Sequence, residues 1–180
     1  QGDEEKIMGT DYSRIYWARD EGSGWGSAAE LDNLNGTAGH ARWPVIVRGA
    51  SDKMHVFWMD SSLDPSSLLG HIVHKSISST NTASAQETVS DQNVAFSATQ
   101  TQFAPPQYYD DGGVERITVI WKRSSNGDLS SAEIDNDGVP GAEETVSTLT
   151  TGLDTIGSAV DTATKTIYAL LGGQALDLFL

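Results

Sequence analysis

Residues 86–90 read Gln-Glu-Thr-Val-Ser, and residues 143–147 read Glu-Glu-Thr-Val-Ser. Each segment follows, after a loop, another short predicted strand, at 70–74 and at 131–134 respectively. Short runs of this kind, bounded by clusters of Gly, Asn, Asp and Ser, are typical of β-strands. The shared sequence therefore marks the last strand of two similar units of the chain.

Each of these units opens with a predicted antiparallel hairpin, and a third hairpin follows them. The hairpins combine Val, Ile, Trp, Tyr and Thr with turns rich in Gly, Asp and Ser, which favours strands over helices. The strand pairs that share this pattern are 44–47 with 54–58, 106–109 with 117–121, and 156–160 with 166–170. In each hairpin we expect the second strand to be the better buried.

Four antiparallel strands that recur at intervals of roughly 40–60 residues are the sequence signature of β-propeller blades. We therefore predict an all-β chain, a single β-propeller segment over residues 1–180 with about three blades of four strands. An ordinary β-sandwich is the alternative, and the repeated Glu-Thr-Val-Ser text favours the propeller. The expected units are a half blade at about 12–33, blades at about 40–91 and 103–148, and a partial blade at about 153–180 whose further strand is 176–179.

Composition narrows the classes of function. The chain has 25 acidic and 11 basic residues, a net charge of −14, and no cysteine. A nucleic-acid backbone needs clustered Lys and Arg, so nucleic-acid binding is excluded. No apolar run approaches the roughly 20 residues of a membrane-spanning helix, so no membrane span is expected. Disulfides, thiol nucleophiles and Cys-ligated zinc are absent, whereas neutral ligands such as sugars and divalent cations remain compatible with this charge.

The segment 18–25 reads Ala-Arg-Asp-Glu-Gly-Ser-Gly-Trp. It resembles the Asp-box, Ser-x-Asp-x-Gly-x-Thr-Trp, of sialidase-type (BNR-repeat) propellers, with Asp20, Gly22 and Trp25 at matching offsets and Ala18 and Gly24 as departures. In such a turn the Asp carboxylate can accept backbone N–H bonds and Gly supplies a positive φ. We expect Trp25 to staple the hairpin to the next sheet. The motif indicates fold more than activity.

The resemblance to sialidases also suggests ligand-binding residues. Sialidases bind the substrate carboxylate with three Arg, the first in a Phe-Arg-Ile-Pro motif, and Ala41-Arg42-Trp43-Pro44 is similar to it. A guanidinium suits bidentate recognition of a carboxylate. The ligand-binding candidates are Arg42, Trp43, Tyr108 and Tyr109. The alternatives are an Arg that bonds neighbouring carbonyls at a blade edge and tyrosines that only pack. The other two Arg, the Tyr–Glu nucleophile pair and the acid of a sialidase are not assigned, so the catalytic residues remain unknown.

Residues 133–144 have the spacing of an EF-hand-like calcium loop. The candidate ligands are Glu133, Asp135, Asp137 and Glu144, with Gly138 at the sharp turn. Glu133 stands where Asp is usual, and a plain polar turn is the alternative. Calcium is the one cofactor that the sequence suggests. His55, His71 and His74 are interpreted as ordinary strand residues, because positions 71 and 74 point to opposite faces of a strand.

About three blades cannot close a ring, which typically needs four to eight. We therefore expect further blades, supplied by the rest of a longer chain or by another chain, or by copies of this one in a homo-oligomer. The predicted function is a secreted or cell-surface carbohydrate-binding or structural propeller module with a glycan as ligand. An exo-glycosidase of sialidase type, with catalytic groups on blades outside this sequence, and a structural subunit of an extracellular assembly are the alternatives.

Overall fold

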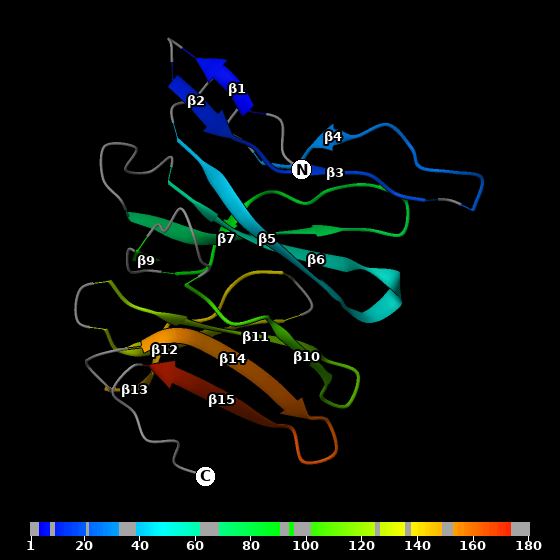
Figure 1. The fold of residues 1–180 in the computed structure, drawn as a ribbon. Helices are drawn as coiled ribbons and strands as arrows, with labels where there is room; N and C mark the ends of the chain where they lie inside the picture. The colour runs from blue at the N-terminus through cyan, green and yellow to red at the C-terminus, as the bar shows by residue number, and fades with distance from the viewer. Residues whose placement is uncertain are drawn as a thin grey trace.

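The computed structural model describes residues 4–7, 10–20, 22–32, 39–61, 69–90, 94–95, 102–124, 127–135, 138–148 and 153–173. This part of the chain consists of β-strands and one 3₁₀ turn, Ala50–Asp52, which confirms the all-β prediction. It contains no helix with the length and apolar character needed to cross a membrane. Figure 1 shows the strands arranged in successive layers from the N-terminal to the C-terminal hairpin.

Two of the layers are antiparallel sheets with the same strand order. The first contains β5 (Ala41–Arg48), β6 (Met54–Asp60), β7 (Leu69–Ile77) and β8 (Glu87–Thr88), with β9 (Val94–Ala95) also paired to β7. The second contains β10 (Gln107–Asp110), β11 (Glu115–Lys122), β12 (Leu129–Ile134) and β13 (Glu144–Ser147). The four-stranded antiparallel units that the sequence predicted are confirmed. We call these the first and the second sheet.

Three two-stranded hairpins complete the described strands: β1 (Glu4–Ile7) with β2 (Thr10–Ser13), β3 (Tyr16–Trp17) with β4 (Ala29–Glu30), and β14 (Leu153–Asp161) with β15 (Thr166–Gly173). The β1–β2 pair is not foreseen in the sequence. In the last hairpin the expected burial of the second strand is wrong, because Tyr168 and Leu170 of β15 are 57% and 68% exposed. The further strand expected at 176–179 lies outside the described residues.

Strand β6 lies at the centre of the packing, because alternate residues of a strand point to opposite faces. Phe57 and Met59 join an apolar cluster between the first and second sheets, where Trp121 of β11 is also fully buried. Val56 and Trp58 point the other way, into a cluster with Ile15 and Leu31 beside the β3–β4 hairpin. The first sheet is therefore covered on both faces.

Polar contacts join the outer layers to the sheets. The buried ammonium of Lys75 in β7 donates to the carbonyl of Leu31 at 2.7 Å, which ties the first sheet to the end of β4. On the far side Ser158 Oγ of β14 donates to the Pro105 carbonyl at 2.6 Å, next to β10. Within the described ranges these layers do not close into a barrel or a ring, so the propeller remains a proposal.

Candidate functional site

The connection between β3 and β4 is a tight turn organised by Asp20. Its Oδ1 accepts the backbone N–H of Gly22 at 2.8 Å and of Gly24 at 3.3 Å. Both glycines have positive φ, 85° and 123°, a region that other L-residues rarely adopt. The N–H of Gly26 donates to the Arg19 carbonyl at 2.8 Å and closes the base of the turn. The Asp20 carboxylate thus accepts backbone N–H bonds within the turn and Gly22 supplies a positive φ, as the spacing of these residues predicted.

Asp20→Ala should lower the free energy of unfolding by about 1 kcal/mol, because two backbone donors lose their acceptor. Asp20→Asn keeps an acceptor oxygen at the same place and should stay close to wild type. Urea unfolding of both variants measures the difference. Equal stability of the alanine and asparagine variants would contradict the assigned role of the carboxylate.

Trp25 does not staple the hairpin to a sheet, so that expectation is wrong: its side chain is 75% exposed. Asp20 and Trp25 pair with each other across the turn, and the indole stays largely in solvent. Trp25 instead forms one wall of a cleft of about 450 Å³, whose other lining residues include Trp17, Arg19 and Asn81. We call this the Trp25 cleft.

Arg19 gives the cleft a positive group in a fixed position. Its guanidinium donates to the Ser79 carbonyl at 2.7 Å and to Asn81 Oδ1 at 2.9 Å, both in the loop that follows β7. These contacts join the β3–β4 turn to the first sheet across 60 residues of sequence. The cleft thus combines an aromatic plane with a guanidinium group, bonded to the Ser79 carbonyl, and with the Asn81 amide that accepts from this guanidinium.

A larger groove between the β3–β4 hairpin and the first sheet, with a volume of about 960 Å³, shares Trp17, Arg19 and Trp25 with the Trp25 cleft. Its walls carry the exposed aromatic ring of Tyr16 and the exposed side chain of Ile46, with charged groups at Arg48 and Asp52. Aromatic surface with a few fixed polar groups is the usual composition of small-molecule sites.

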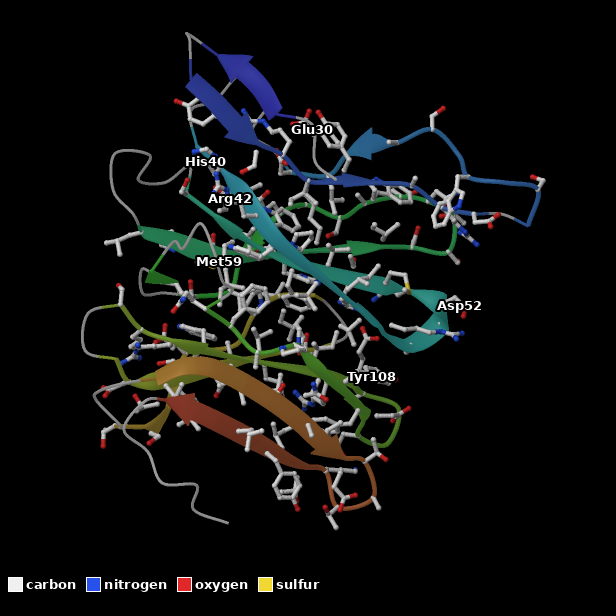
Figure 2. The ribbon with its side chains drawn as sticks, viewed as in Figure 1. Glu30, His40, Arg42, Asp52, Met59 and Tyr108 are labelled. Carbon is white, nitrogen blue, oxygen red and sulfur yellow. The ribbon has the colours of Figure 1, made fainter. Side chains whose placement is uncertain are left out.

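The four predicted ligand-binding residues are not brought together. Arg42 lies near the start of β5, where its Nε donates to Ser13 Oγ at 2.9 Å. Trp43 follows at a β-bulge with φ of 60° and packs against the cluster between the two sheets. Figure 2 shows Arg42 beside His40 at one end of the layers, and Tyr108 near the other end, on the side of Asp52. The antiparallel topology separates these residues, which sequence proximity to a motif could not reveal.

Tyr108 and Tyr109 alternate across β10. Tyr108 packs against the cluster between the sheets. Tyr109 points to the other face, where its hydroxyl donates to Glu133 Oε2 at 3.0 Å. Burial and this hydrogen bond raise the pKa of the Tyr109 phenol, so it stays protonated and acts as a donor.

The candidate calcium ligands are divided between a strand and a turn. Glu133 is the fifth residue of β12, and its second oxygen accepts from Arg116 at 2.7 Å, so both of its oxygens are engaged away from the turn. The turn itself is closed by Gly138 N–H donating to the Asp135 carbonyl at 2.9 Å. Glu144 is exposed on β13, and Asp137 lies outside the described residues. The described residues contain no cluster of three or more side chains suited to a metal ion.

The histidines interpreted as ordinary strand residues include a pair that is not ordinary. His55 of β6 and His74 of β7 are fully buried and contact each other between the two sheets, next to Glu115 of β11. The sequence gives no periodic signal for this group, because Glu115 is 60 residues from His55 and reaches it only when the sheets stack.

In comparisons with known proteins, no family model, curated protein or solved structure matches the chain. The functional interpretation therefore depends on the geometry of the molecule itself.

Proposed function

We propose that this chain is part of a sialidase-like β-propeller, secreted or at the cell surface, that binds carbohydrate in the Trp25 cleft. The architecture supports the first part, because two sheets of identical antiparallel order lie in successive layers and an Asp-box-like turn joins β3 and β4. Both are features of a blade repeat. Arg42 and the two tyrosines do not share a site, so the described residues add no support for the exo-glycosidase alternative.

The observation that carries the binding proposal is the position of Trp25. A large aromatic side chain that is 75% exposed presents a flat apolar surface to solvent. The apolar face of a sugar ring suits such a surface, and its hydroxyl groups suit the adjacent Asn81 amide and Arg19 guanidinium. The chain's excess of acidic residues favours a neutral glycan over a polyanionic one.

Trp25→Ala should weaken binding of a neutral oligosaccharide by about 30-fold or more, which corresponds to the 2 kcal/mol typical of an aromatic anchor. A glycan array identifies ligands of the wild-type chain, and calorimetry compares the variants. Tyr168→Ala is the matched control, since this ring is also exposed, at 57%, but lies on β15 outside the cleft. Wild-type protein that binds no glycan, or a Trp25→Ala variant that binds as well as wild type, would refute the proposal.

A structural role in an assembly is the second candidate, and β15 is the observation in its favour. Tyr168 and Leu170 expose large apolar side chains on the same face of this strand. Adjacent exposed apolar groups are a common mark of interaction surfaces. Sedimentation over a range of concentrations tests this candidate, and a Leu170→Asp variant should remove any self-association.

A further inference from the structure

Three ionisable side chains are buried together between the first and second sheets. His55 is 0% exposed, His74 1% and Glu115 2%. Their neighbours at this interface are mainly apolar, including Phe57, whose ring centroid lies 4.8 Å from that of His74. Buried ionisable groups are rarely tolerated unless they pair with one another.

The three side chains form a continuous chain of contacts. Glu115 Oε2 accepts the backbone N–H of Ala50, and Glu115 Oε1 lies 3.0 Å from His55 Nε2. On its other side His55 Nδ1 lies 2.9 Å from His74 Nε2. The first sheet thus contributes the two imidazoles, and the second sheet contributes the carboxylate. We call this the Glu-His-His chain.

The spacing determines where the protons reside. The 2.9 Å contact between His55 Nδ1 and His74 Nε2 has room for one proton only. A proton on His55 Nε2 faces the Glu115 carboxylate and avoids the repulsion of two lone pairs. A neutral pair carries two ring protons, and these two positions account for both. His74 Nδ1 is then the ring nitrogen without a proton, and it lies beside the backbone of Gly138.

A third proton can enter the pair only at His74 Nδ1. That atom is buried beside the turn at Gly138, where an alanine Cβ would lie 3.8 Å from the imidazole Cε1. Protonation would place a positive charge in an apolar interface, and a hydrogen bond with the Gly138 backbone offsets only part of that cost. The positive charge of Lys53, 3.7 Å from Glu115 Oε1, opposes it further.

The remaining groups around the Glu-His-His chain do not supply a negative charge that would balance a protonated His74. Tyr108 of β10 is affected by the charge of Glu115, but its phenol is neutral and its pKa is raised. Gly49, at the end of β5, contributes only backbone, and the hydrogen bond with the Gly138 backbone raises the pKa of His74 by less than burial lowers it. Glu115 is therefore the one anion shown to contact the pair among the described residues, and it already faces both His55 and Lys53.

We propose that the Glu-His-His chain is a latch between the two sheets that acid releases. When both imidazoles are neutral, His55 and His74 stay packed against Glu115 between the sheets. Uptake of a third proton favours states in which the sheets separate and the imidazoles reach water. The latch is independent of carbohydrate binding. It would make the stability of the sheet interface fall in mildly acidic surroundings.

The direction of the pKa shifts agrees with this geometry. Burial, with a smaller contribution from His55 and against the opposing effect of a hydrogen bond with the Gly138 backbone, lowers the pKa of His74 from 6.5 to about 3. Burial also lowers the pKa of His55, against the opposing effect of Glu115. An unfolded histidine therefore binds a proton in the window between pH 6.5 and about 3 that folded His74 does not. Stability is complete above pH 6.5 and decreases as the pH falls through that window.

Urea unfolding at pH 7.5, 6.5, 5.5 and 4.5 tests the latch on the whole chain. For each extra proton taken up, the unfolding constant should rise up to about tenfold per pH unit below pH 6.5. His74→Gln keeps an amide donor toward His55 Nδ1 but cannot take the third proton. Between pH 6.5 and 4.5 the unfolding constant of wild type should therefore rise by a factor about 30 to 100 times larger than that of His74→Gln.

His71→Gln is the matched control, because His71 is on the same strand, is only partly buried and contacts the Ser90 carbonyl instead. It should retain the wild-type pH dependence. Equal pH dependence of wild type and His74→Gln would overturn the proposal. Hydrogen exchange separates interface opening from general acid effects, since β6, β7 and β11 should lose protection together below pH 6.

A second measurement needs no variant and covers the case in which His74→Gln does not fold. Nitrogen-15 NMR of the histidine rings in wild-type protein reports each tautomer directly. We expect both His55 and His74 to be Nε2–H tautomers that stay neutral in the folded protein down to pH 4.5. A His74 ring that protonates near pH 6.5 while the protein remains folded would overturn the latch.

Discussion

Gly49→Ala is expected to lower the free energy of unfolding by about 3–5 kcal/mol, the range found when a buried ion pair is broken. The added Cβ would overlap Glu115 Oε2 and lie 2.7 Å from His55 Nε2. Neither side chain can retreat, because both are fully buried. The backbone is not the cause, since φ of −98° and ψ of −164° suit any residue. The variant therefore tests how tightly the Glu-His-His chain is packed.

Gly26→Ala provides the control for this prediction. Its Cβ would lie 3.5 Å from the Arg19 carbonyl, an ordinary contact, so the change should stay within about 0.5 kcal/mol. Chemical unfolding at pH 7.5 compares the two. If Gly49→Ala were as stable as Gly26→Ala, the close approach of Gly49 to Glu115 and His55 would have to be wrong.

Trp58→Ala should cost about 3–5 kcal/mol of unfolding free energy, as expected for a large aromatic side chain removed from a core. Trp58 is 0% exposed and packs with Ile15 and Leu31, which connect the first sheet to the β3–β4 hairpin. The cavity would separate these layers as well as weaken β6. Thermal unfolding and urea unfolding both measure the loss.

Trp58→Phe should cost much less than the alanine variant. Phenylalanine fills most of the space, and it removes an indole N–H that has no hydrogen-bond partner among the described residues. Ile46→Ala, at a 57% exposed position of β5, should change stability by less than about 1 kcal/mol. A Trp58→Ala loss no larger than that of Ile46→Ala would show that the first sheet is not covered on this face.

Local sequence patterns predict the strands well, because strand formation depends on residues that are close together in the sequence. The hairpin over 44–58 has β-branched and aromatic residues on both sides of a turn, and its pairing places Val47 opposite His55 as the pattern requires. The third hairpin shows the limit of this reasoning. Residues 166–170 have an equally apolar pattern, yet Leu170 is 68% exposed, because burial depends on whether another layer covers the strand.

The candidate sites were harder to predict, for a physical reason. The turn at Asp20 depends on contacts within five residues and could be deduced from spacing alone. The orientation of Trp25 depends on where the turn points, and the Glu-His-His chain depends on how two sheets stack. Arg42 and Tyr108 illustrate the same limit, since a motif does not state which end of a sheet each residue occupies.

The two apolar faces of β6 have a consequence for folding accuracy. In most strands a slip of one residue is prevented because it would turn polar side chains inward. In β6 such a slip would exchange one apolar set for another, so hydrophobicity alone discriminates poorly between the two alignments. His55 differs, because a slip would move its imidazole into the cluster around Trp58, away from Glu115. We therefore expect the His55–Glu115 contact to select the native alignment of the strand, a role in which a buried polar pair contributes specificity rather than strength.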